Sequence, residues 1–415
     1  MERDRKQSKR SKLYKTHRQV VDYENSGCES STDGGGGGGV VVREYDEEED
    51  KVGVEEMERR CEIGEGGKPS LVADLLGDPI CRVRHFPSHI MLVAEYGNGR
   101  EIVGVIRGCI KTVTRGNSLY LRVLIIRKRR RLGIGKKLVQ KLEEWCKKNG
   151  AEYVYMATDC TNEASINLFT RKCEYTKFRT PTMLVQPVHA HYKSLGSGIA
   201  IVQLNPKLAE TLYRRAFANS EFFPKDIEKI LSNKLSLGTF MALPKKSLPK
   251  WDPKTGILPP SFAIMSVWST KQLFRLQVKG VSMLTYACCM ASRVLDAWMP
   301  WMMLPSFPDV FRKFWVYFLY GLHMEGKNGP RLMKSLCAFA HNMGRDDDGC
   351  GAVVAEVGQR DPVREVIPHW RKLSMSEDLW CIKKLNYRSD EKCGLSDWLN
   401  SRPSSPLIFV DPRDI

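Results

Sequence analysis

Six consecutive residues, Arg130-Arg131-Leu132-Gly133-Ile134-Gly135, carry the residue types that a diphosphate-binding loop needs. They follow an apolar run typical of a strand and open a helical pattern. The first backbone N–H groups of a helix have no partner within the helix, and the helix dipole adds positive charge at that end. Gly133 and Gly135 let the main chain approach a ligand closely, and the arginines add charge complementarity. The motif therefore predicts a diphosphate site.

Two other phosphate-binding loops do not fit this motif. No Gly-Lys-Ser/Thr follows the glycines, which excludes a Walker loop. No further glycine occurs three residues after the Gly pair, which excludes the dinucleotide fingerprint. For the motif taken alone, a helix N-terminus with incidental glycines stays an alternative.

The elements around the loop follow an alternating α/β order. The apolar run at 118–126 predicts a strand before the loop, and the pattern at 135–149 predicts a helix with one apolar face after it. Residues 153–157 then predict a strand, residues 162–170 a short helix, and residues 182–188 a strand that closes the sheet. We expect a mixed central sheet flanked by helices.

The residues before the loop supply the rest of this first unit. Residues 1–39 are basic, then rich in serine, and end in six glycines, a composition typical of a flexible leader. Two helical patterns and then a β-hairpin through Gly97-Asn98-Gly99 are expected at 51–60, 70–76, 89–96 and 101–110. The ordered unit is thus predicted at 40–190.

The second half repeats part of this pattern. Glycines and apolar residues recur at a constant offset, so that 329–344 match 135–150, and a strand pattern follows at 352–357. We interpret residues 199–415 as a diverged second copy of the unit at 40–190. The alternative is chance recurrence of an amphipathic helix between two glycines.

The second copy lacks the phosphate motif. Its helix is preceded by Gly326-Lys327-Asn328-Gly329 without Arg-x-x-Gly-x-Gly, so we expect no cofactor there. Its expected role is to shape or cover the acceptor groove of the first copy, or to bind the substrate protein. Its aromatic residues are expected to pack in the core or between the domains: Trp298, Trp301, Phe311, Phe314 and Trp315.

Charge and composition limit the function classes. The 415 residues hold 65 Lys and Arg against 48 Asp and Glu, a net charge of +17, which favours an anionic partner. The longest apolar stretch, 281–304, is interrupted by Arg293 and Asp296, so no membrane span is expected. The charged N-terminus argues against a secretory signal. The 13 cysteines include no Cys-x-x-Cys and indicate neither a disulfide framework nor a zinc site.

The motif and the residues that follow it resemble the GCN5-related N-acetyltransferase (GNAT) family. Arg-x-x-Gly-x-Gly lies between a strand and an amphipathic helix, and NEASINLF follows the next strand at 162–169. More narrowly, uncommon strings are similar to plant hookless-type N-acetyltransferases, among them VREYD at 42–46, DLLGDPICR at 74–82, NKLSLGTF at 233–240 and IFVDPR at 408–413. They are collinear over nearly everything after residue 40.

The resemblance implies transfer of an acetyl group from acetyl-CoA to an amine. In the family, two neighbouring parallel strands splay apart around the pantetheine arm, which bonds to main-chain groups of the fourth strand, here Leu124, Ile125 and Ile126. The diphosphate is then expected on the loop from Arg130 to Lys136, with Asn162 beside the cofactor arm.

The resemblance also implies a biological setting. The acceptor is expected to be a protein lysine or N-terminal amine, with histones among the candidates. A role in plant growth and in hormone or light responses is implied, in the nucleus or the cytoplasm. No metal is expected.

Catalysis by direct transfer requires a base, an oxyanion donor and an acid for the leaving thiolate. Many family members place a tyrosine as the acid where this chain has Phe169, which has no proton to give. Asp159 is the nearest carboxylate to nominate as base, against the alternative of a capping residue in a loop. The short segment from Ile110 to Arg130 is compatible with an irregular or truncated fourth strand. A catalytically impaired GNAT-fold interaction protein is therefore the second hypothesis.

Two further features have competing interpretations. His189 and His191 would face the same side of a strand, but no third ligand accompanies them, so a metal site is not expected. The basic run at 127–131 and the basic leader are compatible with nuclear import or nucleic-acid binding. Aromatic residues are not interleaved with these basic residues, which argues against a stacking platform for single-stranded nucleic acid. We interpret the run at 127–131 as part of the phosphate site.

Overall fold

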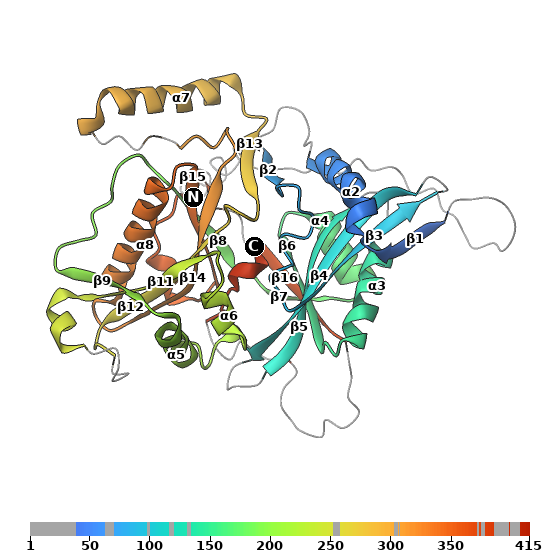
Figure 1. The fold of residues 1–415 in the computed structure, drawn as a ribbon, viewed down its shortest axis with the longest axis horizontal. Helices are drawn as coiled ribbons and strands as arrows, with labels where there is room; N and C mark the ends of the chain where they lie inside the picture. The colour runs from blue at the N-terminus through green and yellow to red at the C-terminus, as the bar shows by residue number, and fades with distance from the viewer. Residues whose placement is uncertain are drawn as a thin grey trace, which may run out of the picture.

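The computed structural model describes residues 39–62, 70–97, 100–115, 120–130, 134–251, 258–302, 306, 308–371, 373–374, 378–385, 398 and 407–415. The predicted leader, apart from Gly39, lies outside these residues. The described residues form two large sheets that lie side by side, each with helices against it, and a third sheet of two strands (Figure 1). Among them, no helix is both long and apolar enough to cross a membrane.

The first sheet has eight strands, with the order β1-β3-β4-β5-β6-β16-β7 and β10 beside β4. Its strands are β1 Val40–Glu44, β3 Ser88–Tyr96, β4 Glu101–Arg115, β5 Tyr120–Arg130, β6 Tyr153–Asp159, β7 Thr176–Arg179, β10 Glu221–Pro224 and β16 Asp378–Lys384. Only β5 and β6 are parallel, and every other neighbouring pair in this sheet is antiparallel. The predicted hairpin is confirmed as β3 and β4.

The amphipathic helix predicted after the loop is confirmed as α3 Gly135–Lys148, which connects β5 to β6. It buries one face against the sheet because apolar residues recur on that face every three or four positions. Leu138, Val139, Leu142 and Cys146 are all fully buried in the core on this face. The other helices of this half are α2 Glu47–Glu62, α4 Glu163–Asn167 and the π-helical turn η1 Leu168–Lys172.

The second helix predicted before the hairpin is wrong. Residues 70–76 contain the strand β2 Ser70–Asp74, which pairs antiparallel with β13 Arg275–Lys279 in the second half. A segment of five residues carries too little periodic signal to distinguish a strand from a helix, and its pairing with a distant segment decides which one forms.

The second sheet has six strands, with the order β8-β15-β14-β12-β11-β9. Its strands are β8 Thr182–Pro187, β9 Ile199–Leu204, β11 Ser236–Pro244, β12 Phe262–Ser269, β14 Trp315–Glu325 and β15 Cys350–Val357. Here too one pair is parallel, β14 with β15, and α8 Gly329–Asp346 connects the two strands. Strand for strand, the order and directions match β16-β6-β5-β4-β3-β1, which confirms a diverged second GNAT-like unit.

The two halves exchange their closing strands. Residues 182–188 do form a strand, but β8 pairs with β15 of the second sheet, so the expectation that it closes the first sheet is wrong. Its place beside β6 is taken by β16, from the end of the chain. A local pattern predicts that a segment is a strand but carries little information about its partner.

A shared core lies between the two sheets. It contains Tyr155 and Trp380 from the first sheet and Trp268 and Phe318 from the second. Residues 407–415 run into this core, so the C-terminal end lies at the centre of the molecule (Figure 1). The remaining helical elements of the second half are α5 Pro206–Ala216, α6 Ile227–Leu231, α7 Met283–Trp298 and the short turns η2 Lys245–Lys250, η3 Pro300–Met302, η4 Pro362–Glu365 and η5 Pro412–Asp414.

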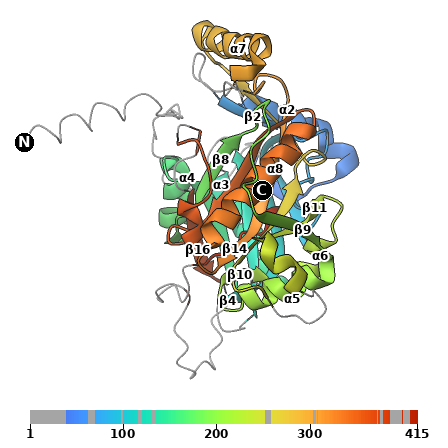
Figure 2. The same ribbon diagram turned by 90° about the vertical axis from the view of Figure 1, so that its left-hand side faces the viewer.

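Helix α7 stands away from the body of the molecule (Figure 2). Trp298 is 80% exposed and Trp301 is 74% exposed, so the expectation that these two residues are buried is wrong. Phe314 and Trp315 are buried, as expected. The difference arises because α7 contacts the rest of the chain along only one narrow face, where Asp296 is its buried residue.

Candidate active site at the separated strands

The parallel strands β5 and β6 separate part-way along the sheet. They pair from Val123–Tyr153 to Ile126–Met156, and then β5 continues to Arg130 and β6 to Asp159. Beyond the separation each strand keeps its partner on the outer edge, β4 for β5 and β16 for β6. On the inner edges, the described residues provide no strand partner, so main-chain N–H and C=O groups face the gap.

The strand β5 is full-length and regular. Its 11 residues pair with β4 without a register shift, from Tyr120 opposite Thr114 to Arg130 opposite Gly104. The possibility of a truncated or irregular fourth strand is therefore wrong. The segment from Ile110 to Arg130 holds two strands because the connection between them has only four residues, 116–119.

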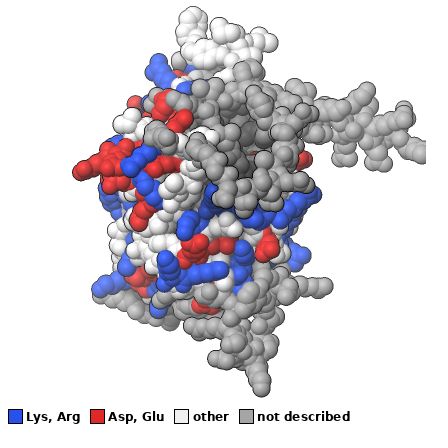
Figure 3. Space-filling view, turned by 90° about the vertical axis from the view of Figure 1, so that its right-hand side faces the viewer, with Lys and Arg blue, Asp and Glu red and all other residues white. Residues whose placement is uncertain are grey.

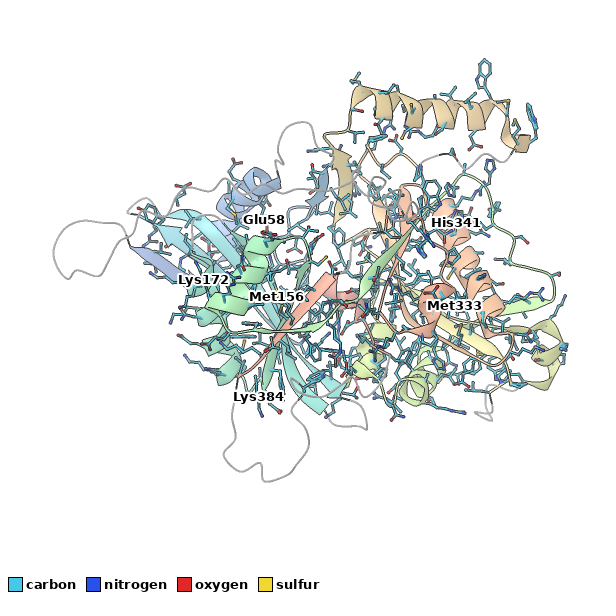
Figure 4. The ribbon with its side chains drawn as sticks, turned by 180° about the vertical axis from the view of Figure 1, so that it is seen from behind. Glu58, Met156, Lys172, Met333, His341 and Lys384 are labelled. Carbon is cyan, nitrogen blue, oxygen red and sulfur yellow. The ribbon has the colours of Figure 1, made fainter. Side chains whose placement is uncertain are left out.

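The predicted cofactor contacts lie at the start of this gap. Leu124, Ile125 and Ile126 belong to the last part of β5 that pairs with β6, and Met156, labelled in Figure 4, is the last paired residue of β6. Main chain without a β6 partner begins at the next residue, Arg127. Contacts of Leu124–Ile126 with an acyl carrier remain a prediction. The geometry favours residues 127–130, next to them, for main-chain contacts with the carrier.

The N-terminus of α3 lies at the same edge of the sheet, immediately after β5. Gly135 is its first residue, and Ile134 before it supplies no side-chain cap. The first turn holds no acidic residue, while Lys136 and Lys137 are exposed there. Since unpaired N–H groups, the helix dipole and two lysines coincide, this end favours an anion. Arg131, Leu132 and Gly133 of the motif lie outside the described residues.

Asn162 and Asp159 both act in local capping. The Asn162 side chain accepts a hydrogen bond of 3.1 Å from the Ser165 N–H at the start of α4. Asp159 Oδ1 accepts from the Thr161 N–H at 2.7 Å and from its hydroxyl at 2.5 Å. This is the loop-capping arrangement that competes with a catalytic role for Asp159, whose assignment as base stays a prediction.

Phe169 belongs to the core beneath the site. Its ring is fully buried and packs edge-on against Tyr175, with 5.1 Å between ring centroids. The Tyr175 hydroxyl donates to Glu143 at 3.0 Å, and Lys383 donates to the same carboxylate at 2.9 Å. Burial, together with the Glu143 carboxylate, raises the pKa of Tyr175 well above its usual value. The hydroxyl of Tyr175 is therefore part of a buried structural hydrogen-bond network.

A buried charged group, missed by sequence reasoning, lies on the other face of the sheet. The Tyr155 hydroxyl donates to Asp414 at 3.0 Å, and Lys111 forms a 2.6 Å ion pair with the same carboxylate. Asp411 is fully buried beside them and is paired with Arg413 at 2.7 Å. Burial, and then Asp414, raises the pKa of Tyr155 well above its usual value. The residues are far apart in the sequence, and only the string IFVDPR marked this segment as distinctive.

The histidines serve packing. His189 Nδ1 lies 2.9 Å from the Ser306 carbonyl, and His191 Nε2 lies 2.5 Å from Asp296. These contacts join the connector after β8 to the segment around α7. Among the described residues, no group of three His, Cys, Asp or Glu side chains is arranged to hold a metal ion.

Comparison with known proteins identifies the family. The model of the acetyltransferase (GNAT) family matches residues 53–175. The chain is 50% identical over 401 residues to "Probable N-acetyltransferase HLS1" of Arabidopsis thaliana, which covers 89% of this chain and 98% of that protein. It is 40% identical over 420 residues to "Acetyl transferase GW6a" of Oryza sativa subsp. japonica, covering 89% of this chain and 96% of that protein.

The chain belongs to the hookless-type branch of the GNAT acetyltransferase family. Among solved structures, it is similar to Saccharomyces cerevisiae N-myristoyltransferase with bound myristoyl-CoA, with a TM-score of 0.51 and 9% identity over 83% of this chain and 79% of that one. At this identity the similarity concerns the fold alone. Within the GNAT fold of this chain, the separated strands and the N-terminus of α3 form the candidate active site.

Proposed function

We propose that this protein transfers an acetyl group from acetyl-CoA to an amine of a protein acceptor. The observation that carries the proposal is the separation of β5 from β6 beside a helix N-terminus without acidic residues. At residues 127–130, the edge of β5 away from β4 has no strand partner among the described residues, which supports binding of the pantetheine amides by strand-like hydrogen bonds. The N-terminus of α3, with Lys136, supports binding of the diphosphate.

The acceptor amine then attacks the thioester carbonyl, and the carbon–sulfur bond breaks to release CoA. Holding the thioester against a rigid strand removes the entropic cost of bringing the reactants together. Main-chain N–H groups at the gap are suited to stabilise the oxyanion. Phe169 cannot protonate the leaving thiolate, because its side chain has no acidic proton.

A second candidate function is a GNAT-fold interaction protein without catalysis. The observation that favours it is Phe169, a fully buried ring in place of the family's usual tyrosine. A third interpretation, direct nucleic-acid binding, would need a basic surface. On the face shown in Figure 3, basic and acidic side chains of the described residues are interspersed, which does not support it.

The first experiment measures ligand stabilisation of the full chain. Acetyl-CoA at 100 times its Kd should stabilise the protein by about 2.7 kcal/mol, and CoA should also stabilise it. Gly133→Glu should abolish both shifts, whereas Lys327→Glu, in the corresponding loop of the second half, should leave them unchanged. No shift with either ligand would reject acetyl-CoA binding.

Release of free CoA thiol then separates the two candidates. Lysine-rich histone peptides and poly-L-lysine serve as acceptors, with acetylation of the peptide measured by mass spectrometry. Thiol release coupled to peptide acetylation supports the transferase. Stabilisation by acetyl-CoA without either signal supports the interaction protein.

We further propose action in the nucleus or cytoplasm of plant cells, in the regulation of growth and of responses to hormones or light. The proposal rests on the similarity to the Arabidopsis and rice proteins and on the basic residues at the N-terminus. A fluorescent fusion of the full chain, compared with one that lacks residues 1–39, tests the location. Exclusion of both fusions from the nucleus would reject the nuclear part.

A further inference from the structure

The exchanged strand β16 brings a second carboxyl to the edge of the candidate site. Asp378, its first residue, lies directly opposite Asp159, the last residue of β6. Further along the same pair, Trp380 lies opposite Ala157 and Ile382 lies opposite Tyr155. Cross-strand partners share a face of the sheet, so both carboxyls lie on the face of Tyr155, away from α3.

This face is open just beyond the separation of the strands. Ala157 is exposed, although Tyr155 before it is buried. Asp159 lies three residues after Met156, where the strands part, which corresponds to roughly 10 Å along a strand. An extended lysine side chain entering over Ala157 can therefore pass the two carboxyls before it reaches the vertex of the gap.

Asp378 and Asp159 differ in their partners. Asp159 is held as an acceptor by Thr161. Among the described residues, neither an ion pair nor a side-chain hydrogen bond reaches the half-buried carboxyl of Asp378. Arg179 on the neighbouring strand lies opposite Trp380, but its guanidinium is held by Glu221 at 2.8 Å. Within the part of the chain that the structure describes, no cation is paired with Asp378.

The electrostatics of the pair fit a proton acceptor. Burial, and then the Asp159 carboxylate, raises the pKa of Asp378 to about 6. A base whose pKa lies near the working pH is efficient, because it is mostly ionised and still holds a proton well. The paired carboxyls also attract a cationic ammonium group.

A further polar group points to a ligand here. The indole N–H of Trp380 is buried, with 3% of the residue exposed, and has no hydrogen-bond partner among the described residues. Trp380 is the next residue after Asp378 on the same face of β16. Unsatisfied buried donors are rare in native proteins and often mark a place for a water or a substrate.

We infer that Asp378 is the general base that removes a proton from the acceptor ammonium group, directly or through one water. The inference rests on the proposed acetyl transfer. The carboxylate takes one proton from R–NH3⁺, and the resulting amine forms the C–N bond as the C–S bond breaks. The second amine proton passes to the CoA thiolate, and Asp378 returns its proton to solvent. A residue from the end of the chain thus completes the site of the first half.

The test compares Asp378→Asn with the wild-type full chain, using acetyl-CoA and poly-L-lysine and measuring thiol release from pH 5 to pH 9. The wild-type rate should fall below an apparent pKa near 6. Asp378→Asn should lose about 10²- to 10⁴-fold in kcat at neutral pH, which is the usual contribution of a general base. It should also lose this acidic limb, and its rate should rise with pH as free amine accumulates.

The matched control is Asp361→Asn. Asp361 is a buried carboxyl of the second half whose pKa is also raised to about 6 by burial. It lines the small cavity beside Tyr320 and Glu356 of the second sheet, so its substitution should leave the acidic limb in place. Loss of the limb in both variants would overturn the assignment, because a general effect of carboxyl removal would then explain it.

Two readouts separate this inference from the proposed function. Acetyl-CoA should stabilise Asp378→Asn as it stabilises the wild type. The folded pKa of Asp378 lies above its unfolded value, so its carboxylate opposes folding increasingly as pH rises from about 4 to about 6. The Tm of Asp378→Asn minus that of the wild type should therefore increase over this window.

An active wild type with an equally active Asp378→Asn variant overturns the base assignment and leaves acetyl transfer standing. A wild type that binds acetyl-CoA but acetylates no amine rejects acetyl transfer and, with it, the assignment. A Tm difference that does not change with pH also overturns the assignment, since Asp378 would then not titrate in this range.

Discussion

The two halves of the molecule share one topology but differ where their parallel strands separate. In the first half, β5 and β6 part after Ile126 and Met156, and Ala157 just beyond is exposed. In the second half, β14 and β15 pair as far as Leu319 and Ala355. The space beyond them is a cavity of about 10 Å³, lined by Tyr320, Glu356 and residues 408–410 among others. Beyond the separation, the first half leaves Ala157 exposed, whereas the second half fills the corresponding groove with residues 408–410 of the chain itself.

The segment before α8 is closely packed. Gly326 has a φ of +74°, and a Cβ at this position would lie 2.2 Å from the carbonyl oxygen of Pro260. This glycine is therefore required for close packing of the second half against its own main chain. In the first half, α3 begins with Gly135 and exposes Lys136. The comparison teaches that one fold can either bind a ligand between its separated strands or use that space as core.

The largest expected effect comes from emptying the filled groove. Phe409 is 1% exposed and packs edge-on against Phe217 and Phe223, with 5.1 Å between centroids in both cases. Phe409→Ala should lower the free energy of unfolding by about 3–5 kcal/mol, because it removes a large buried ring and leaves a cavity. Urea denaturation measures this loss, and Met302→Ala, at a 53% exposed position, is the control.

The same variant sharpens the comparison of the grooves. Because the second half lacks the basic glycine motif, Phe409→Ala should still bind one equivalent of acetyl-CoA by calorimetry. Binding of two equivalents would show that the C-terminal segment alone, and not the loop, distinguishes the halves.

The sequence predicted the parts of the fold that depend on local patterns. The apolar face of α3, the hairpin through Gly97 and the strand–loop–helix motif at Arg130 were all readable, because period and turn residues are local signals. The partners of β8, β16 and β2 were not, because a strand pattern does not specify which distant strand it meets.

The same limit applies to the candidate site. The residues proposed to contact the cofactor come from one continuous stretch, from β5 to α4, so the sequence alone could suggest them. The carboxyl proposed for the acceptor side could not be suggested in this way, because Asp378 reaches Asp159 only through the exchange of β16 for β8. Likewise, Asp414 reaches Lys111 and Tyr155 only through the path of the last residues into the shared core.

The second expected effect comes from placing a ring beside the separated strands of the first half. Ala157→Phe adds this ring to the face of β6 just beyond the separation and so imitates the filled second half. Because Ala157 is exposed, the fold should remain stable and acetyl-CoA should still stabilise it, while acetylation of poly-L-lysine should be lost, since the ring lies on the route inferred for the acceptor lysine. Thermal unfolding measures stability and ligand binding, and thiol release measures acetyl transfer.

The control for this variant is Ala291→Phe, at an exposed position of α7. It adds the same ring to the surface of the second half and should keep the full rate of acetyl transfer. Undiminished acetylation by Ala157→Phe would mean that the acceptor does not pass over this face of β6, and the exposure of Ala157 would then not explain the difference between the halves.

The smallest expected effect compares the helix starts directly. Lys136→Glu places a negative charge in the first turn of α3, where it opposes a bound diphosphate, and should weaken acetyl-CoA binding about fivefold at low salt. Because the side chain is exposed, the difference should shrink as ionic strength rises. Arg331→Glu makes the same reversal near the start of α8, at the position that matches Lys137, and should not change the Kd. Equal weakening by both variants would show that the net charge of the protein, and not the N-terminus of α3, sets the affinity.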